Sequence, residues 1–169
     1  MRLQESVRRL AAAQLHHLCV STTAEQGRSG LVRPLLRLAA DASLAVLAPL
    51  LPHLPAIVAR FPLAASAATL WTALLDLEAE HGARHWRIVV AVVRTAGVLA
   101  AQLPQEVQQE ELLPLLFRVL QSGPVAAEDA AAEALVTVFR GLRRERVRTD
   151  VRCPPSVRAP QVCGHPHLN

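Results

Sequence analysis

The chain of 169 residues contains no lysine and no tyrosine, and aromatic side chains make up only 3% of it. β-Sandwiches and β-barrels are built from β-branched and aromatic residues in short alternating runs. Here the apolar residues, 51% of the chain, are mostly Leu, Ala and Val in long stretches, which is typical of helices. The composition therefore argues against an all-β fold and predicts an all-α one. The absence of lysine also excludes a P-loop, whose lysine binds the nucleotide phosphates.

Cysteine is scarce, and long apolar runs are missing. Three cysteines, Cys19, Cys153 and Cys163, are odd in number and widely spaced, so no disulfide framework is expected and a reducing compartment is favoured. The first five residues carry charges and show no signal-peptide core. The longest weakly charged run, 44–59, is interrupted by prolines and is shorter than the roughly 20 residues that span a bilayer. We expect a protein of the cytoplasm, with the nucleus as the alternative, and no membrane partner.

Positive charge is concentrated near the end of the chain. Residues 140–158 contain seven arginines and two acids, whereas 11 arginines and 12 acids precede them. A basic body would indicate a nucleic-acid surface. This body is close to neutral, so nucleic-acid binding is expected only through the Arg-rich C-terminal segment, if at all.

The apolar periodicity predicts seven helices with short connections. Prolines at 49, 52 and 55 predict that the third helix is kinked or broken, and Pro114 is expected to bend the sixth. We expect a helical domain over 1–146 and a disordered Arg- and Pro-rich tail over 147–169. The expected helices are 3–20, 31–40, 43–60, 64–80, 85–103, 105–121 and 125–144.

An internal repeat decides between a compact bundle and a stack of hairpins. The apolar pattern that begins at Ala11 recurs in outline at Leu47, Val92 and Ala131, which gives an average period of about 40 residues. A two-helix unit of that length is the period of HEAT and armadillo arrays. Each hairpin would then bury its apolar face against its neighbours. We therefore predict an all-α, right-handed α-solenoid of HEAT-like helical hairpins, with about three and a half repeats.

Particular residues carry a family resemblance over roughly 1–142. Leu31–Asp41 and Leu112–Leu120 share a core of the form LxxPLLxxL, Asp41 matches the turn aspartate of the HEAT pattern, and Val7-Arg8 matches its Val-Arg pair. The stretch that opens with His85-Trp86-Arg87 resembles repeats of the protein phosphatase 2A scaffolding subunit and of phosphatase 4 regulatory subunits. Ser122 and Glu128 depart from the pattern, which puts a continuous Asp–Arg ladder between repeats in doubt.

In such arrays the second helices line the concave face, where partners bind. The prediction is a non-catalytic scaffold or regulatory module for a partner protein, and the resemblance implies a serine/threonine protein phosphatase catalytic or regulatory subunit as that partner. The alternative is an adaptor for nucleic acid or an acidic partner that uses the Arg-rich segment. We do not expect an enzyme, because the sequence shows neither a nucleophile–base pair nor a set of metal ligands. No cofactor is expected either. The predicted partner-binding residues are Arg33, Arg37, Asp76, Glu80, Gln109 and Arg118.

The histidines are interpreted as ordinary rather than metal-binding residues. His16 and His17 are adjacent on a helix and point about 100° apart, so they cannot chelate one metal as residues at i and i+4 can. His81 and His85 have that spacing, but Gly82 between them predicts a turn. In the tail, the spacing of the Cys and His residues matches no zinc pattern. The tryptophans, Trp71 and Trp86, are both predicted to be packed in the core.

The first and the last predicted helices lack the polar capping repeats that usually end a solenoid. Solenoids need about three or more repeats and polar capping repeats. The first helix carries Val7, Leu10, Leu15 and Leu18 with no cap before it, and the seventh has an apolar stripe with no second helix after it. We expect both stripes to face solvent and to mark an interface. The chain is therefore predicted to self-associate, or to belong to a longer solenoid. The stripe on the seventh helix consists of Ala130, Ala131, Ala134, Leu135, Val138 and Phe139.

Overall fold

The fold is all-α. The computed structural model describes residues 4–23, 25, 30–61, 63 and 66–152, with side chains as far as 142. No strand occurs among these residues, and helices joined by short turns account for most of them. The predicted fold class is therefore confirmed at this level.

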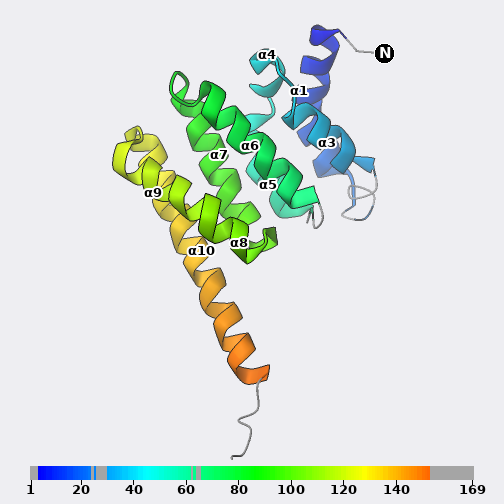
Figure 1. The fold of residues 1–169 in the computed structure, drawn as a ribbon. Helices are drawn as coiled ribbons and strands as arrows, with labels where there is room; N and C mark the ends of the chain where they lie inside the picture. Colours follow the sequence, from blue (N-terminus) through cyan, green and yellow to red (C-terminus); the bar gives the residue numbers. More distant parts are fainter. Residues whose placement is uncertain (1–3, 24, 26–29, 62, 64–65, 153–169) are drawn as a thin grey trace, which may run out of the picture.

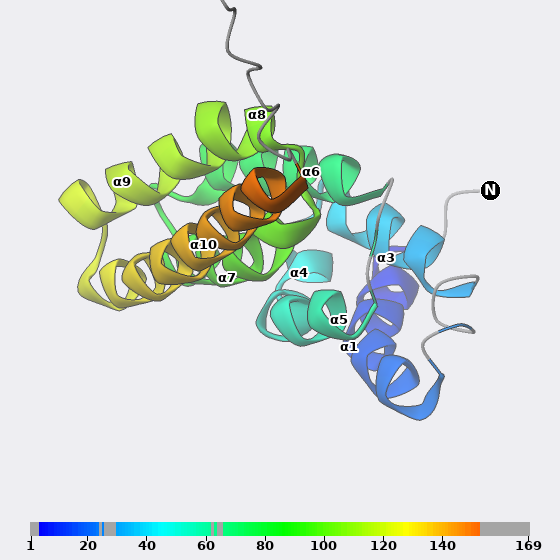
Figure 2. The same cartoon turned by 90° about the horizontal axis from the view of Figure 1, so that it is seen from below.

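The helices lie in two rows (Figures 1 and 2). One row contains α1 (Glu5–Ser21), then α4 (Leu44–Leu47) with η1 (Leu51–His53) and α5 (Leu54–Arg60), then α7 (Trp86–Leu99) and α10 (Val125–Arg152). The other contains α3 (Val32–Ala39), α6 (Ala67–His81), and α8 (Gln105–Val107) with the π-turn η4 (Gln108–Leu112) and α9 (Leu113–Ser122). A short 3-10 turn, η3 (Ala100–Gln102), follows α7. The chain thus alternates between the rows, and neighbouring helices within the first row pack on one another.

Proline breaks the third predicted helix, as expected. The segment predicted at 43–60 is divided into α4, η1 and α5, with Pro52 in the first turn of η1 and Pro55 in that of α5. Proline is accepted at these positions because the first N–H groups of a helix have no partner within it. Pro114 acts differently: the helix widens into η4 just before it. A proline cannot donate to the carbonyl four residues earlier and collides with it, and the wider turn accommodates this.

The core is formed by Leu, Val and Ala from both rows, and α7 lies at its centre. Helix α7 is apolar on most of its circumference, with nine buried residues, because α5, α6 and α10 all pack on it. Helix α10 approaches α7 closely at Gly97, where an added Cβ would lie 3.0 Å from the Cβ of Ala134. The small residue at 97 therefore permits the tight contact between the last two helices of the first row.

The two tryptophans have opposite environments. Trp71 is 1% exposed, which confirms the prediction that it is packed. The prediction for Trp86 was wrong: its side chain is 45% exposed at the first position of α7, and the Arg87 guanidinium lies 4.8 Å from its ring centroid. Trp86 lies on the exposed side of this first turn, in the groove lined also by residues of α6 and α9, whereas Ile88 and Val89 of the same turn are buried. The side of the helix on which Trp86 lies, rather than its hydrophobicity, therefore decides its exposure.

The predicted apolar stripe of the last helix is also corrected. Ala130, Ala131, Ala134, Leu135 and Val138 are buried, because α10 packs on both α7 and α9. Phe139 is exposed, as expected, and so are Val125 and Val136, which are the other large apolar side chains exposed on α10 as far as residue 142. On α1 the expectation holds for Val7, Leu10 and Leu18, which are exposed, and fails for Leu15, which is buried.

Helix α10 is longer than the sequence predicts. It continues to Arg152, past the expected end at 144 and into the segment assigned to the tail, and it projects from the helical body (Figure 1). Residues 153–169, with Cys153, Cys163, His165 and His167, lie outside the described residues. The prediction that this part is disordered stays a prediction.

Candidate protein-binding surface

The six predicted partner-binding residues all lie on the second row and are all exposed. Arg33 and Arg37 come from α3, Asp76 and Glu80 from α6, Gln109 from η4, and Arg118 from α9. The structure brings Asp76 and Glu80 together in one groove and places Arg118 in another. Neither groove includes the two arginines of α3 or Gln109.

The first groove, between the C-terminal end of α3 and α6, has a volume of about 620 Å³. Its rim contains Asp76, Glu80 and His81, and its floor contains Ala39, Ala73 and Leu77. Asp41 also lines it, although an arginine from α1 pairs with that carboxylate. The apolar floor and the acidic side chains at the rim together suit a peptide in which basic side chains flank an apolar side chain.

The second groove, of about 470 Å³, lies between α6, the start of α7 and α9. Arg118 donates a 2.8 Å hydrogen bond to the Glu78 carboxylate across it, while its own side chain stays 59% exposed. Trp86 and Arg84 complete the rim on the other side. An exposed tryptophan between arginines is the composition found at the centres of protein interfaces.

Two side-chain hydrogen bonds join α6 to the next second-row segment, η4 with α9. Trp71 Nε1 donates a 2.6 Å hydrogen bond to Glu111 Oε2, and the Glu78–Arg118 pair joins the same helices two turns further along α6. Each pair spans 40 residues of sequence. The sequence analysis did not identify these pairs, although the period of about 40 residues is the signal that could have found them.

The two residues that match the HEAT pattern are in contact. Arg8 Nε donates a 2.6 Å hydrogen bond to Asp41 Oδ2, and the Ser43 N–H donates to Asp41 Oδ1 at 2.9 Å. The hydrogen bond from Arg8 is the main reason that the pKa of the Asp41 carboxyl lies below its ordinary value; burial of the carboxyl opposes it. Asp41 therefore fastens α1 to the turn between α3 and α4.

A cluster of histidines lies on the first row, where α1 meets η1. The ring of His53 stacks on that of His16, with centroids 3.8 Å apart and planes 7° apart, and His17 lies against His16 at 3.7 Å. The sequence analysis treated His16 and His17 as isolated residues, because His53 approaches them only through the tertiary packing. No group of three or more His, Cys, Asp or Glu residues in the described part of the chain is arranged to hold a metal ion.

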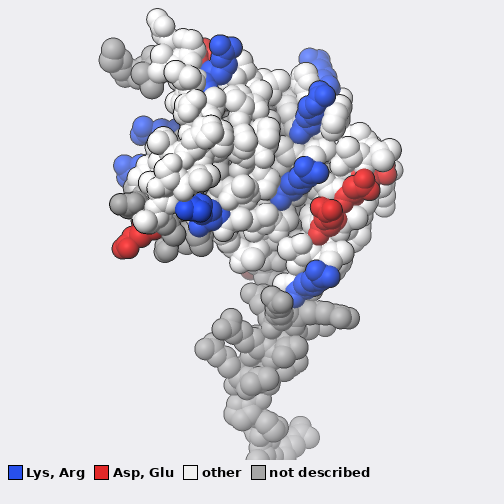
Figure 3. Space-filling model, turned by 180° about the vertical axis from the view of Figure 1, so that it is seen from behind, with Lys and Arg blue, Asp and Glu red and all other residues white. Residues whose placement is uncertain are grey.

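Among the described residues, the face opposite the second row carries no continuous basic patch (Figure 3). Arginine side chains appear there as separate groups, some with acidic side chains beside them (Figure 3). This distribution does not have the clustered positive charge of a nucleic-acid footprint. Within the described ranges, no helix is long and apolar enough to cross a bilayer.

Comparisons of this chain with protein-family models, with curated proteins and with solved structures found no match.

Proposed function

We propose that the chain is a right-handed, HEAT-like α-solenoid of about three and a half helical hairpins. The alternation of the chain between two rows and the 40-residue spacing of the Trp71–Glu111 and Glu78–Arg118 pairs support this. In a stacked array, equivalent helices of neighbouring units meet at equivalent positions, so contacts recur at the repeat length.

The function that this arrangement supports best is that of a non-catalytic scaffold or regulatory module that binds a partner protein on the second row. The observation that carries the proposal is the groove between α3 and α6, where Asp76 and Glu80 border an apolar floor. The partner would present a basic peptide segment. The resemblance of the sequence to phosphatase scaffolding repeats supports a serine/threonine protein phosphatase subunit as that partner, in the cytoplasm or the nucleus.

Affinity purification of the full chain, with bound proteins identified by mass spectrometry, tests this proposal. Asp76→Arg with Glu80→Arg is expected to remove a phosphatase subunit from the bound fraction, because both carboxylates would be replaced by cations. The matched control is Glu106→Arg with Glu110→Arg, an exposed acidic pair on α8 and η4 outside the groove. Equal recovery of the subunit with both variants, or no phosphatase subunit at all, would contradict the proposal.

The second row can be tested against the Arg-rich segment in the same assay. Asp76→Arg with Glu80→Arg is expected to weaken partner binding without a loss of helicity, whereas Arg143→Glu with Arg144→Glu is not. The opposite result would favour the alternative function, an adaptor for nucleic acid or an acidic partner. Binding of RNA with a steep salt dependence, lost when 140–169 are deleted, would identify nucleic acid as the ligand.

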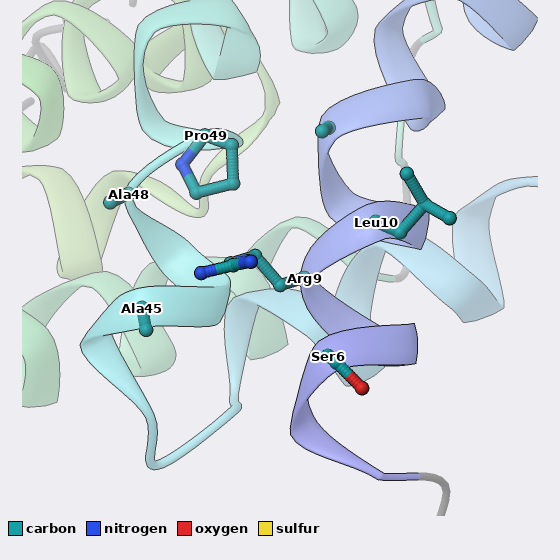
Figure 4. A pocket seen from close by; sticks show the side chains of 7 residues that line it. Ser6, Arg9, Leu10, Ala45, Ala48 and Pro49 are labelled. Atoms are coloured by element: carbon teal, nitrogen blue, oxygen red, sulfur yellow. The ribbon is translucent and has the colours of Figure 1, made fainter.

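We also propose that the chain self-associates through the two ends of the first row. At one end, Leu10 is 63% exposed and points away from α4, beside a groove of about 570 Å³ into which Arg9 extends (Figure 4). At the other, Val136 and Phe139 of α10 are half exposed. Contact between such ends buries both sets of apolar side chains and continues the stacking order of the row.

A further inference from the structure

Three histidine side chains, His16, His17 and His53, lie together at the junction of α1 and η1. His16 and His53 belong to different elements, and their rings lie face to face. Both side chains are partly buried, and His16 Nδ1 is buried without a hydrogen-bond partner among the described residues.

Among the described helices that surround the histidine cluster, no negatively charged side chain lies near the rings to compensate a protonated imidazole. Helices α4, α5 and α7 and the turn η1 contain no aspartate or glutamate, and α1 contains only Glu5, about three turns from His16. The cations on these elements include Arg9 of α1, Arg60 of α5, and Arg87 and Arg94 of α7. Cys19, one turn after His16, is buried, and burial raises the pKa of its thiol, so it stays neutral. Protonation of the cluster would therefore add positive charge to surroundings that already carry positive charge.

We propose that the stacked rings of His16 and His53, with His17 beside them, make the attachment of α1 to the rest of the first row dependent on pH. While the rings are neutral they pack together. When two of them carry a proton, like charges less than 4 Å apart repel, and the C-terminal half of α1 separates from η1. This inference concerns a conformational property and does not depend on the proposed partner.

The pKa of His53 is shifted in the direction that the proposal requires. Burial, with smaller contributions from His16 and His17, lowers the pKa of His53 below its ordinary value. A base whose pKa is lower in the folded than in the open state binds more protons in the open state, so acid favours opening. The stabilisation from the packed rings is fully present above the ordinary histidine pKa of about 6.5 and is lost progressively as the pH falls below that value.

Other contacts determine how far α1 can move. The Arg8–Asp41 pair holds the N-terminal half of α1, and the lowered pKa of Asp41 keeps that carboxylate ionised in the range where histidines titrate. At the C-terminal end, Arg60 donates hydrogen bonds to the carbonyls of Val20 and Thr22, at 3.3 and 3.1 Å. Opening is therefore expected in the second half of α1, around Leu15 and Cys19, before any unfolding of the body.

Amide hydrogen exchange of the full chain, corrected for the intrinsic effect of pH, tests the proposal. Protection of peptides from 12–21 is expected to fall below about pH 6.5, by up to about tenfold per pH unit for each extra proton that binds on opening. Peptides from α7 should keep their protection over the same range. In His53→Phe, which retains an aromatic ring but not the proton site, the protection of α1 should no longer depend on pH. His85→Phe, a change in the exposed turn before α7, is the matched control and should behave as the unchanged chain does.

Histidine titration by NMR gives a second measurement, which remains valid if His53→Phe folds poorly. His16→Phe should raise the pKa of His53 toward its ordinary value, because the neighbouring charge is gone, whereas His85→Phe should not. The proposal would be overturned by pH-independent protection of α1 in the unchanged chain. It would equally be overturned if the pH response persisted in folded His53→Phe, or if the titration of His53 were insensitive to His16→Phe.

Discussion

The indole Nε1 of Trp71 donates a hydrogen bond of 2.6 Å to Oε2 of Glu111, which lies 40 residues further along the chain. Trp71 is 1% exposed, whereas Glu111 is exposed, so the bond connects a core residue of α6 to the surface of the next second-row segment. The buried indole N–H depends on this carboxylate, because a buried donor without an acceptor is costly.

Removal of the carboxylate is expected to destabilise the chain. Glu111→Ala leaves the Trp71 N–H without its acceptor and should lower the free energy of unfolding by about 1–3 kcal/mol. Denaturant unfolding followed by circular dichroism measures this. Glu110→Ala, the adjacent exposed residue, should change stability by no more than about 0.5 kcal/mol. Equal stability of the two variants would mean that the bond contributes nothing.

The Arg8–Asp41 pair predicts a loss of stability in acid. The pKa of Asp41 is lower in the folded than in the unfolded chain, so its contribution is present above the unfolded value of about 3.9 and is lost as the pH falls through the folded value. In Asp41→Asn this part of the pH dependence should be absent. Unfolding curves between about pH 2 and pH 6 show the difference. Asp76→Asn, on the exposed surface of α6, is the control, and a flattening of the curve as large as that in Asp41→Asn would count against the prediction.

The close contact of α7 and α10 at Gly97 predicts intolerance of larger residues. Gly97→Val forces atoms into the space occupied by Ala134 and should cost about 1–3 kcal/mol of stability. Gly141→Val, at a position with no atom within 4 Å of an added Cβ, should stay within about 0.5 kcal/mol. Thermal unfolding of the two variants provides the comparison. A Gly97→Val variant as stable as Gly141→Val would show that the two helices can separate without cost.

Self-association is expected at low micromolar concentration, because apolar side chains remain exposed at both ends of the first row. Sedimentation velocity should detect species larger than the monomer. Leu10→Gln with Leu18→Gln, and separately Val136→Gln with Phe139→Gln, should shift the distribution toward the monomer. Phe117→Gln, which removes an exposed apolar side chain from the second row, is the control for a general effect of lost hydrophobicity. A cooperatively melting monomer that binds no hydrophobic dye would contradict the expectation.

The sequence by itself determined the helical class, the approximate bounds of the helices and the effect of the prolines. These properties are local, since apolar periodicity and the missing proline N–H act within a few residues. The core position of Trp71 was predicted from the usual burial of tryptophan, and the same reasoning failed for Trp86. Arg8 and Asp41 could be singled out from the repeat pattern, although their ion pair could not.

Only the tertiary structure decided which of two similar residues is buried and which distant residues meet. Trp86 is exposed because it lies on the outer side of the first turn of α7, whereas Ile88 and Val89 of that turn face the core. Most of the apolar stripe of α10 is buried because α7 and α9 both cover it. The stacking of His53 on His16 and the bond from Trp71 to Glu111 depend on how the rows pack. Such contacts join residues about 40 positions apart, and a local pattern carries no information on the distance or orientation that the packing gives them.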